Sequence, residues 1–483
     1  MEYETVIGLE VHAQLLTKSK MYCGCSTDYA SAPPNTHVCQ VCLGMPGVLP
    51  VINKQAVELT MMTALALNCP VSEFTQFDRK NYPYPDLMKG YQISQSSAPI
   101  GRKGRLTIEV DGQRREIGIN HIHLEEDVAK LLHRTSGGED YSLVDVNRAG
   151  VPLMEIVSEP DLRSPEEARQ YLIKLRSILQ YLGVSTGNME EGSFRCDANI
   201  SIRPAGSKEL GAKVEVKNLN SFKAVYMAMD YEAKRQRKAA AEGKKLVQET
   251  RGWVEDKSRT VSQRSKEYAH DYCYFPEPDL PPMVIGRDWV EAVRKKLPEL
   301  PEARRDRFIK KYSLPRYDAD LLTSSKGMAD YFEEGTKADN QILPKEFSNW
   351  LLGEVSRILN AKYIEMDEFR KKVSPTALTG LIQSSHGNIN IATAKTVLEE
   401  MFNSGKTAED IIKERGLSQI SDTSELEKIV AGVINSNEQP VAEYRAGKEK
   451  AFKFLVGQVM RATKGQANPQ LVNEVLKKKL SEA

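Results

Sequence analysis

Four of the seven cysteines in this sequence lie close together near its N-terminus. Cys23 and Cys25 form one pair, Cys39 and Cys42 form a second, and thirteen residues separate the pairs. Two such pairs of thiolates, each on a tight turn, can surround one Zn²⁺ ion tetrahedrally. Because all four ligands come from the protein, we expect a structural site that holds a loop together and does not catalyse. Four independent buried cysteines are the alternative.

Polar side chains share one face of several predicted strands, because successive side chains on a strand point to opposite sides. In residues 6–15, for example, apolar residues at every second position leave the polar residues together on the other face. Four segments show this alternation, with polar faces formed by Glu10, His12 and Gln14; His121, His123, Glu125 and Asp127; Asp197, Asn199, Ser201 and Arg203; and Lys213, Glu215 and Lys217. The predicted loop Glu190-Glu191-Gly192 adds two carboxylates.

For any single strand, a solvated face explains such polar residues, because an antiparallel sheet often has one side in water. A solvated face is usually rich in Thr, Lys and Gln, however, whereas these faces supply carboxylates and histidines. Carboxylates that share a surface repel one another unless a cation neutralises them, and oxygen ligands suit Mg²⁺ that carries the phosphates of a nucleotide. The pattern therefore favours a site for Mg²⁺ and ATP on a sheet.

Other nucleotide-binding signatures are missing from the sequence. Gly405-Lys406-Thr407 looks like the end of a phosphate-binding loop. Such a loop needs a glycine at position 400, however, where this chain has Glu400, and residues 392–402 are predicted to form a helix and not a strand. The basic residues near the predicted sheet that suit phosphate contacts are Arg79, Lys80 and Lys217, although each alone is more often a surface charge.

The elements that position these residues change in type along the chain. Up to about residue 290, period-2 segments alternate with Gly/Pro turns, and from about 293 the apolar residues recur at helical spacing. Ser164-Pro165 with Gly183, and Ser221 with Gly243, mark the starts and ends of two helices in the first part. Further helices are predicted over 346–359 and 375–384. We expect an α+β fold with domains at 1–292, 293–407 and 408–483.

Composition excludes several classes of protein. The 483 residues carry a net charge of +1 and 40% hydrophobic residues, without an apolar run of membrane-spanning length or a basic signal peptide. The odd number of cysteines favours the reducing cytoplasm over a disulfide framework. Residues 440–483 hold nine basic and four acidic residues, a local charge of +5 that suits either a phosphate backbone or a solvated helix face.

Several long motifs resemble one family closely, and the likeness spans essentially the whole chain. They are Ile7-Gly-Leu-Glu-Val-His-Ala-Gln14, Cys39-Gln-Val-Cys-Leu-Gly-Met-Pro-Gly-Val-Leu-Pro50, Phe77-Asp-Arg-Lys-Asn-Tyr82, His123-Leu-Glu-Glu-Asp127, the stretch from Asn147 to Asp161, Arg195-Cys-Asp-Ala-Asn199, Val214-Glu-Val-Lys-Asn-Leu-Asn-Ser221, and the C-terminal Phe454 to Met460 and Ala467 to Leu480. These motifs resemble the B subunits of the tRNA-dependent amidotransferase GatCAB.

The resemblance implies a heterotrimer with an amidase A subunit and a small C subunit. Such an enzyme converts Glu-tRNA(Gln) to Gln-tRNA(Gln), or Asp-tRNA(Asn) to Asn-tRNA(Asn), and the sequence leaves the choice open. The B subunit would activate the side-chain carboxylate with ATP as an acyl phosphate, which ammonia from the A subunit then attacks. The implied fold is a cradle related to the catalytic sheet of glutamine synthetase, a helical domain and a YqeY-like tail, the last two handling tRNA. A non-discriminating aminoacyl-tRNA synthetase is a further possible partner.

By motif, the resemblance assigns Glu10, His12 and Glu125 to the metal and phosphoryl site. It adds Glu191, Asp197 and Glu215 as further candidates, and it places Arg79 and Lys80 near the ammonia path and the phosphates. The chain departs from the family after Tyr82, where Pro83 and Met88 replace an aromatic residue and a proline, and this puts the local path of the loop in question.

Two rival functions belong to other classes. A zinc-stapled RNA-binding scaffold without catalysis explains the cysteines and the basic tail but leaves the acidic strand faces without a purpose. A self-sufficient glutaminase would need an amidase nucleophile, but Gln95 precedes Ser96-Ser97 where an amidase elbow has glycine, and no N-terminal catalytic cysteine is present.

Overall fold

The computed structural model describes residues 2–265, 273–338, 341–386, 389–417, 423–463, 467 and 469–482. The chain divides into two compact units, Met1–Pro301 and Glu302–Ala483. Lys464, one of the basic residues counted in the tail, lies outside the described residues. The first unit is a sheet domain and the second is helical, so the mixed α+β prediction is confirmed.

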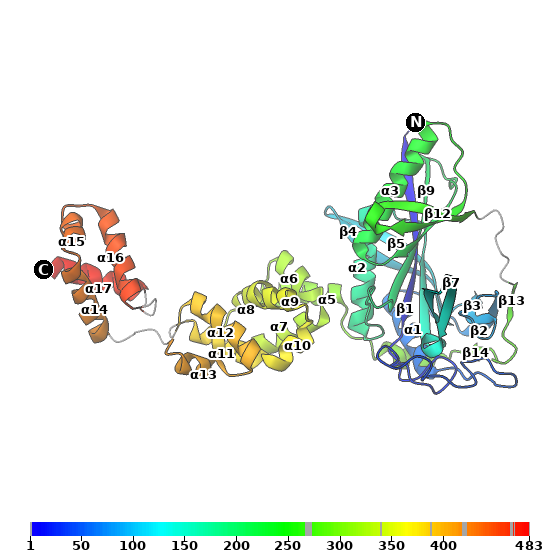
Figure 1. Ribbon diagram of the computed structural model, residues 1–483, viewed down its shortest axis with the longest axis horizontal. Coiled ribbons are helices and arrows are strands. Elements are labelled where there is room, and N and C mark those ends of the chain that lie inside the picture. The colour runs from blue at the N-terminus through cyan, green and yellow to red at the C-terminus, as the bar shows by residue number, and fades with distance from the viewer. Residues whose placement is uncertain are drawn as a thin grey trace. The chain divides into compact units, whose positions relative to one another are not determined.

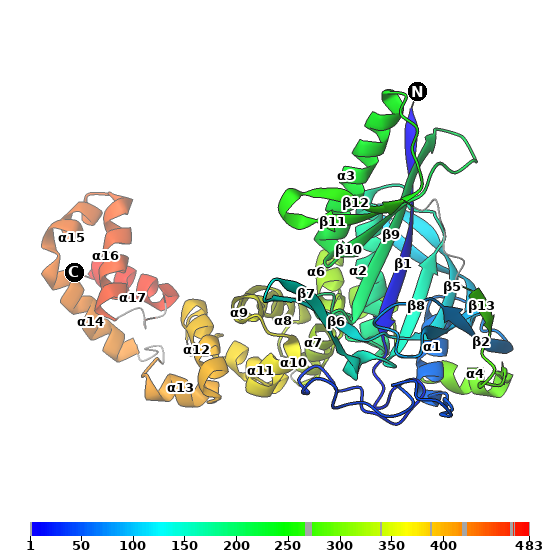
Figure 2. The same ribbon diagram turned by 45° about the vertical axis from the view of Figure 1, so that its right-hand side comes forward.

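An eight-stranded sheet forms the centre of the first unit, and β1 (Tyr3–Gln14) lies in its middle. β1 is antiparallel to both of its neighbours, β8 (Pro152–Ser158) and β9 (Phe194–Pro204). The strand order is β12-β11-β10-β9-β1-β8-β5-β4, and Figure 2 shows β9, β1, β8 and β5 in this sequence across the sheet. The remaining strands are β4 (Gly101–Val110), β5 (Gln113–Glu126), β10 (Val214–Leu219), β11 (Glu249–Val254) and β12 (Arg259–Ser265).

Three helices cover the apolar face of this sheet: α1 (Lys54–Ala66), α2 (Pro165–Leu182) and α3 (Phe222–Ala241). Figure 1 shows α2 and α3 side by side along the sheet. The predicted caps are confirmed, because Ser164 accepts the Glu167 amide at one end of α2 and Gly183 ends the helix with φ +66°. Alternation along β1 buries Ile7, Leu9 and Val11 beneath the helices and leaves the other face open for polar residues.

Smaller elements surround one end of the sheet. A four-stranded sheet contains β2 (Phe74–Asn81), β3 (Tyr91–Ala98), β13 (Cys273–Pro276) and β14 (Met283–Val284). β6 (Lys130–Ser136) and β7 (Glu139–Asp145) form a hairpin, and the 3₁₀ turns are Val146–Arg148 and Glu255–Lys257. α4 (Arg287–Arg294) completes the unit.

The second unit contains two separate hydrophobic cores. The first is built from α5 (Pro301–Tyr312), α6 (Arg316–Thr323), α7 (Lys326–Ala338), α8 (Pro344–Trp350), a π-helical turn (Leu351–Val355), α9 (Ser356–Lys362), α10 (Met366–Lys372), α11 (Pro375–Ser384), α12 (Ile391–Ser404) and α13 (Ala408–Glu414). The second is built from α14 (Thr423–Ser436), α15 (Glu438–Arg445), α16 (Glu449–Ala462) and α17 (Pro469–Glu482). Among the described residues, no helix is long and apolar enough to cross a lipid bilayer.

Both domain borders differ from those that the sequence suggests. The first unit extends beyond residue 292 to Pro301, because Val293 is buried in the sheet core and Leu297 and Leu300 pack against it. Residue 408 does not begin the tail, because Ala408, Ile411 and Ile412 of α13 are buried in the first helical core. Helical spacing alone cannot show which of two neighbouring cores buries an apolar stripe.

The position of α13 predicts different outcomes for two truncations. Removing residues 408–483 takes two buried isoleucines out of the first helical core and should destabilise it by roughly 3–6 kcal/mol. Removing only residues 418–483 leaves that core complete, so its thermal unfolding should match that of the full chain. Circular dichroism at 222 nm measures both transitions. Equal melting of the two truncated chains would contradict the placement of α13.

Candidate active site

The open face of the central sheet brings together residues from four strands. In the antiparallel register, His12 on β1 lies opposite Glu155 on β8, and Glu155 lies opposite His123 on β5. On the other side of β1, His12 lies opposite Arg195 on β9. Directly opposed residues of neighbouring strands present their side chains on the same face, within contact distance. One row across the sheet therefore carries two histidines, a glutamate and an arginine.

Two carboxylates surround the histidines of this row. His12 Nε2 lies 3.6 Å from a carboxylate oxygen of Glu125 and 3.6 Å from one of Glu155. His123 Nε2 lies 3.2 Å from Glu155. One ligand atom each from His12, Glu125 and Glu155 lie within 4.8 Å of one another. An imidazole and two carboxylates at this spacing fit a divalent cation. His12 and Glu125, which the family resemblance assigns to one site, lie together in the structure.

Glu155 is the member of this cluster that the strand patterns did not reveal. A usable signal was present, because Glu155 is the sole charged residue within Pro152–Ser158, an otherwise mostly apolar strand between two buried neighbours. Its side chain is 16% exposed. A charge in such a strand is costly unless it is paired, and therefore indicates a partner across the sheet.

Charge coupling within the cluster shifts several pKa values. Burial alone would lower the pKa of His123, but the charge of Glu155 and hydrogen bonds to Glu125 and Glu155 outweigh burial and raise that pKa to about 10. The pKa of His12 is also raised, because the effects of Glu155 and Glu125 outweigh the lowering effect of burial. Burial opposes ionisation of Glu155, but the two histidines lower its pKa well below its usual range. The charge of Glu155 thus lies between two histidines and favours the protonated form of each.

Glu10 lies two residues before His12 on the same face. The Asn199 amide donates a 2.7 Å hydrogen bond to Glu10, and burial followed by the charge of Glu155 raises the pKa of Glu10. A pocket opens beside it, lined by backbone and side chains that include Gly8, Asn199, Ser201 and Lys213. Glu10 therefore stands between this pocket and the His12–Glu125–Glu155 cluster.

The remaining predicted carboxylates are less free than the sequence suggests. Lys217 Nζ lies 2.7 Å from Asp197 and 3.0 Å from Glu215, and Thr250 donates a 2.9 Å hydrogen bond to Glu215. Lys217 thus engages both carboxylates on β9 and β10 and offsets part of their charge. Glu191 is exposed in a turn, and no described contact connects its side chain to the cluster.

Arg79 and Lys80 belong to β2 in the smaller sheet and not to the central one. Arg79 is ion-paired with Glu277 at 2.7 Å and with Asp279 at 2.9 Å, and its guanidinium lies 4.2 Å from the centre of the Tyr91 ring. The hydrogen bond to Glu277 raises the pKa of Arg79 and keeps it charged. Arg79 thus connects β2 to the segment that carries Glu277 and Asp279, and these two carboxylates engage its guanidinium.

The loop in which the chain departs from its family is anchored locally. The Ala129 amide donates to the Asp86 carbonyl at 3.0 Å, and Met88 packs against a small core formed by Ala129, Val146 and Ala149. Pro83 is exposed. The substituted proline therefore lies in solvent, and Met88 fills an apolar site.

The four clustered cysteines converge as their spacing predicts. One sulfur atom from each of Cys23, Cys25, Cys39 and Cys42 lies within 4.8 Å of the others. The Cys39 amide donates to the Cys42 sulfur at 3.0 Å, and hydrogen bonding from Cys23 lowers the pKa of Cys42 to about 4. Four thiols with at least one favoured thiolate fit a tetrahedral zinc ion.

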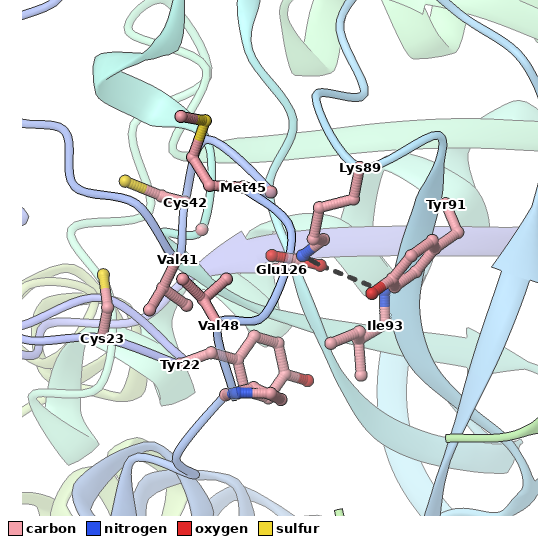
Figure 3. Close-up of a pocket in the computed structure, with 13 residues that line it drawn as sticks. Tyr22, Cys23, Val41, Cys42, Met45, Val48, Lys89, Tyr91, Ile93 and Glu126 are labelled. Carbon is pink, nitrogen blue, oxygen red and sulfur yellow. Dashed lines mark hydrogen bonds and ion pairs between the residues drawn. The ribbon is translucent and has the colours of Figure 1, made fainter. Parts of the chain in front are cut away.

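A pocket separates this cysteine loop from the strands that carry the cluster. Figure 3 shows Cys23 and Cys42 on one side of the pocket and Lys89, Tyr91 and Glu126 on the other. Lys89 is ion-paired with Glu126, and the Ile93 amide donates to Glu126 at 3.1 Å. Since Glu126 follows Glu125 directly, the pocket lies next to the end of β5 that contributes to the cluster.

Replacing Glu155 with glutamine should return the pKa values of His12 and His123 towards 6.5 in metal-free protein. A histidine whose pKa is higher in the folded chain than in the unfolded chain stabilises the fold fully when the pH is below its unfolded pKa. This stabilisation is lost as the pH rises through the folded pKa. Wild-type stability should therefore decline between about pH 6.5 and 10, and it should do so less in Glu155→Gln. Histidine titration by NMR measures the pKa values, with Glu10→Gln as the control that leaves His123 unchanged. An unaltered His123 titration in Glu155→Gln would contradict the coupling.

Comparisons with known proteins agree with this architecture. Residues 5–291 match the GatB/GatE catalytic domain, and residues 330–480 match the GatB domain. The B subunit of the aspartyl/glutamyl-tRNA(Asn/Gln) amidotransferase from Dehalococcoides mccartyi (strain ATCC BAA-2266 / KCTC 15142 / 195) is 63% identical, over 100% of this chain and 99% of its own length. The protein of the same name from Thermodesulfovibrio yellowstonii is 55% identical over the full length of both chains. The chain thus belongs to the family of amidotransferase B subunits, components of a ligase-type enzyme.

Proposed function

We propose that this chain transfers the terminal phosphoryl group of ATP to the side-chain carboxylate of a misacylated tRNA. The substrate is Glu-tRNA(Gln), Asp-tRNA(Asn) or both, as the names of its relatives suggest. The product is an acyl phosphate, from which ammonia displaces phosphate to give the amide. The observation that carries the proposal is the convergence of His12, Glu125 and Glu155 on the open face of the sheet.

These three residues would hold Mg²⁺, with Glu10 beside them. When bound, the ion neutralises phosphate charge and orients the terminal phosphoryl group for attack. The ion would add positive charge next to Glu125 and Glu155, where the triphosphate and the substrate carboxylate both bring negative charge. The pocket beside Glu10 is a suitable place for the nucleoside, because the polar residues Asn199, Ser201 and Lys213 contribute to its lining. The resemblance further suggests that this sheet is related to the catalytic sheet of glutamine synthetase.

Ammonia would come from a partner in a GatCAB heterotrimer that contains an amidase A subunit and a small C subunit. Cys196 is a poor candidate for a glutaminase nucleophile in this chain, since it is 3% exposed and burial raises its pKa well above the usual value. We place the enzyme in the cytoplasm, with the basic C-terminal helices contacting tRNA and a non-discriminating synthetase as a possible supplier of substrate.

We further propose that the four-cysteine site holds a structural zinc ion. The chain should then bind about one equivalent of zinc, and Cys39→Ser with Cys42→Ser should abolish binding and lower the melting temperature. Cys273→Ser is the matched control, because Cys273 is exposed and lies outside the cluster. Metal analysis and thermal melting test both statements. A chain that contains no zinc and melts like the double variant would disprove this site.

Glu125→Gln should reduce ATP-dependent transamidation by about 10²–10³-fold, because it removes a charge from the ion site and preserves the shape of the side chain. The assay uses the complex with both partner subunits and measures amide formation on Glu-tRNA(Gln) and Asp-tRNA(Asn). Glu116→Gln is the control, since Glu116 lies on the same strand with its side chain 61% exposed.

The same assay separates the proposal from its rival. A scaffold that binds RNA without catalysis would tolerate Glu125→Gln, whereas a phosphoryl-transfer site would not. Activity of Glu125→Gln equal to that of Glu116→Gln at saturating Mg²⁺ would refute the proposed role of the cluster.

A further inference from the structure

The proposed reaction brings anions to a face that already carries several carboxylates. A substrate carboxylate and a triphosphate must both approach Glu125 and Glu155, and a divalent ion offsets only part of this charge. Additional positive charge at the reacting phosphoryl group is therefore required. This requirement rests on the proposed function, and a side chain of this face can meet it.

Most cations near the open face are already engaged by carboxylates or carbonyls. Lys217 lies between Asp197 and Glu215, and Arg203 is ion-paired with Glu4. Arg148 donates to the carbonyls of Val128 and Ala129 at 2.8 and 2.9 Å, which occupy its Nε and one terminal nitrogen. Arg79 is held by Glu277 and Asp279 in the smaller sheet.

Arg195 differs from these cations in its position next to the cluster. It lies opposite His12 in the register of β1 and β9, two adjacent strands in Figure 2, so its side chain is on the same face as the cluster. The positive charge of its guanidinium acts to lower the pKa of His12, and the negative charge of Glu125 acts to raise the pKa of Arg195. The side chain is 34% exposed, so it is accessible to a substrate.

Asp127 fixes the orientation of Arg195. Arg195 Nη2 lies 3.0 Å from Asp127, whose side chain is 1% exposed. Gln14 donates to the same carboxylate at 2.7 Å, and the Val128 amide donates to it at 2.9 Å. Within the described part of the chain, Asp127 is the carboxylate that pairs with Arg195. Since a guanidinium carries five N–H donors in a planar fork, this pairing leaves others for a ligand.

We propose that Arg195 is a catalytic residue that binds the oxygen atoms of the transferring phosphoryl group, and that Asp127 is its positioning residue. In this step, an oxygen of the substrate carboxylate forms a bond to the terminal phosphorus of ATP. The bond from that phosphorus to the bridging oxygen breaks, and ADP leaves with the electron pair. No proton or external electron is needed. The charge that Arg195 binds is spread over the equatorial oxygens of the phosphoryl group during transfer.

The test uses the complex with its amidase and small partner subunits and measures kcat and KM for ATP with misacylated tRNA. Arg195→Gln should lower kcat by about 10²–10³-fold, and Arg195→Lys should lower it by about 10-fold, because lysine keeps the charge but not the fork. Asp127→Asn should lower kcat by less than Arg195→Gln. Arg203→Gln is the matched control on the same strand and face, and it should retain wild-type kcat.

Guanidinium rescue separates a catalytic role from a structural one. Added guanidinium should restore part of the kcat of Arg195→Ala in a saturable manner, and it should leave Arg203→Ala unchanged. Near-normal kcat in Arg195→Gln, or an Arg195→Ala complex that guanidinium does not rescue, would overturn the assignment. A wild-type complex that forms no ADP with either misacylated tRNA would instead refute the proposed function itself.

Discussion

The antiparallel pairing of β1 with β8 and β9 is the constraint on which the candidate site depends. β1 supplies Glu10 and His12, and its register fixes their neighbours: Glu155 on one side, Asp197 and Arg195 on the other. Since side chains alternate along a strand, a shift of one residue would move this whole set to the helix-covered face. The apolar residues beneath the helices thus help to hold the charged residues in place, because burial of Ile7, Leu9 and Val11 excludes a shift by one residue.

The fold tolerates so many buried charged side chains because acidic and basic side chains lie next to each other. Glu155 lies between two histidines, Lys217 lies between Asp197 and Glu215, and Asp127 is enclosed by Arg195 and Arg148. An unpaired charge at any of these positions would cost several kcal/mol, whereas each pair offsets most of that cost. The carboxylates of this face are thus engaged within the protein, and an entering nucleotide would bring negative charge that these pairs do not offset.

The cysteine loop and the smaller sheet close one end of the central sheet. The loop contributes Tyr22, Cys23 and Cys42 to a pocket whose other side is formed by Lys89 and Glu126, next to Glu125 of the cluster. A metal that fixes this loop would also fix the pocket wall. Long loops cannot maintain such a wall by hydrophobic burial alone, because little of their surface is covered, and a crosslink of this kind compensates.

Local patterns in the sequence were sufficient for those parts of the structure that depend on nearby residues. Alternation predicted the polar faces, cap residues predicted both ends of α2, and spacing predicted that the four cysteines converge. The family resemblance grouped His12 with Glu125, which lie together in the structure. Contacts between distant segments depended on tertiary structure. The sequence could not show that Glu155 lies between the histidines, that Glu277 engages Arg79, that Lys217 pairs with Asp197 and Glu215, or that α13 joins the first helical core. Propensity and periodicity describe which face a residue occupies, but the order of strands in a sheet and the packing of helices determine what lies opposite that face.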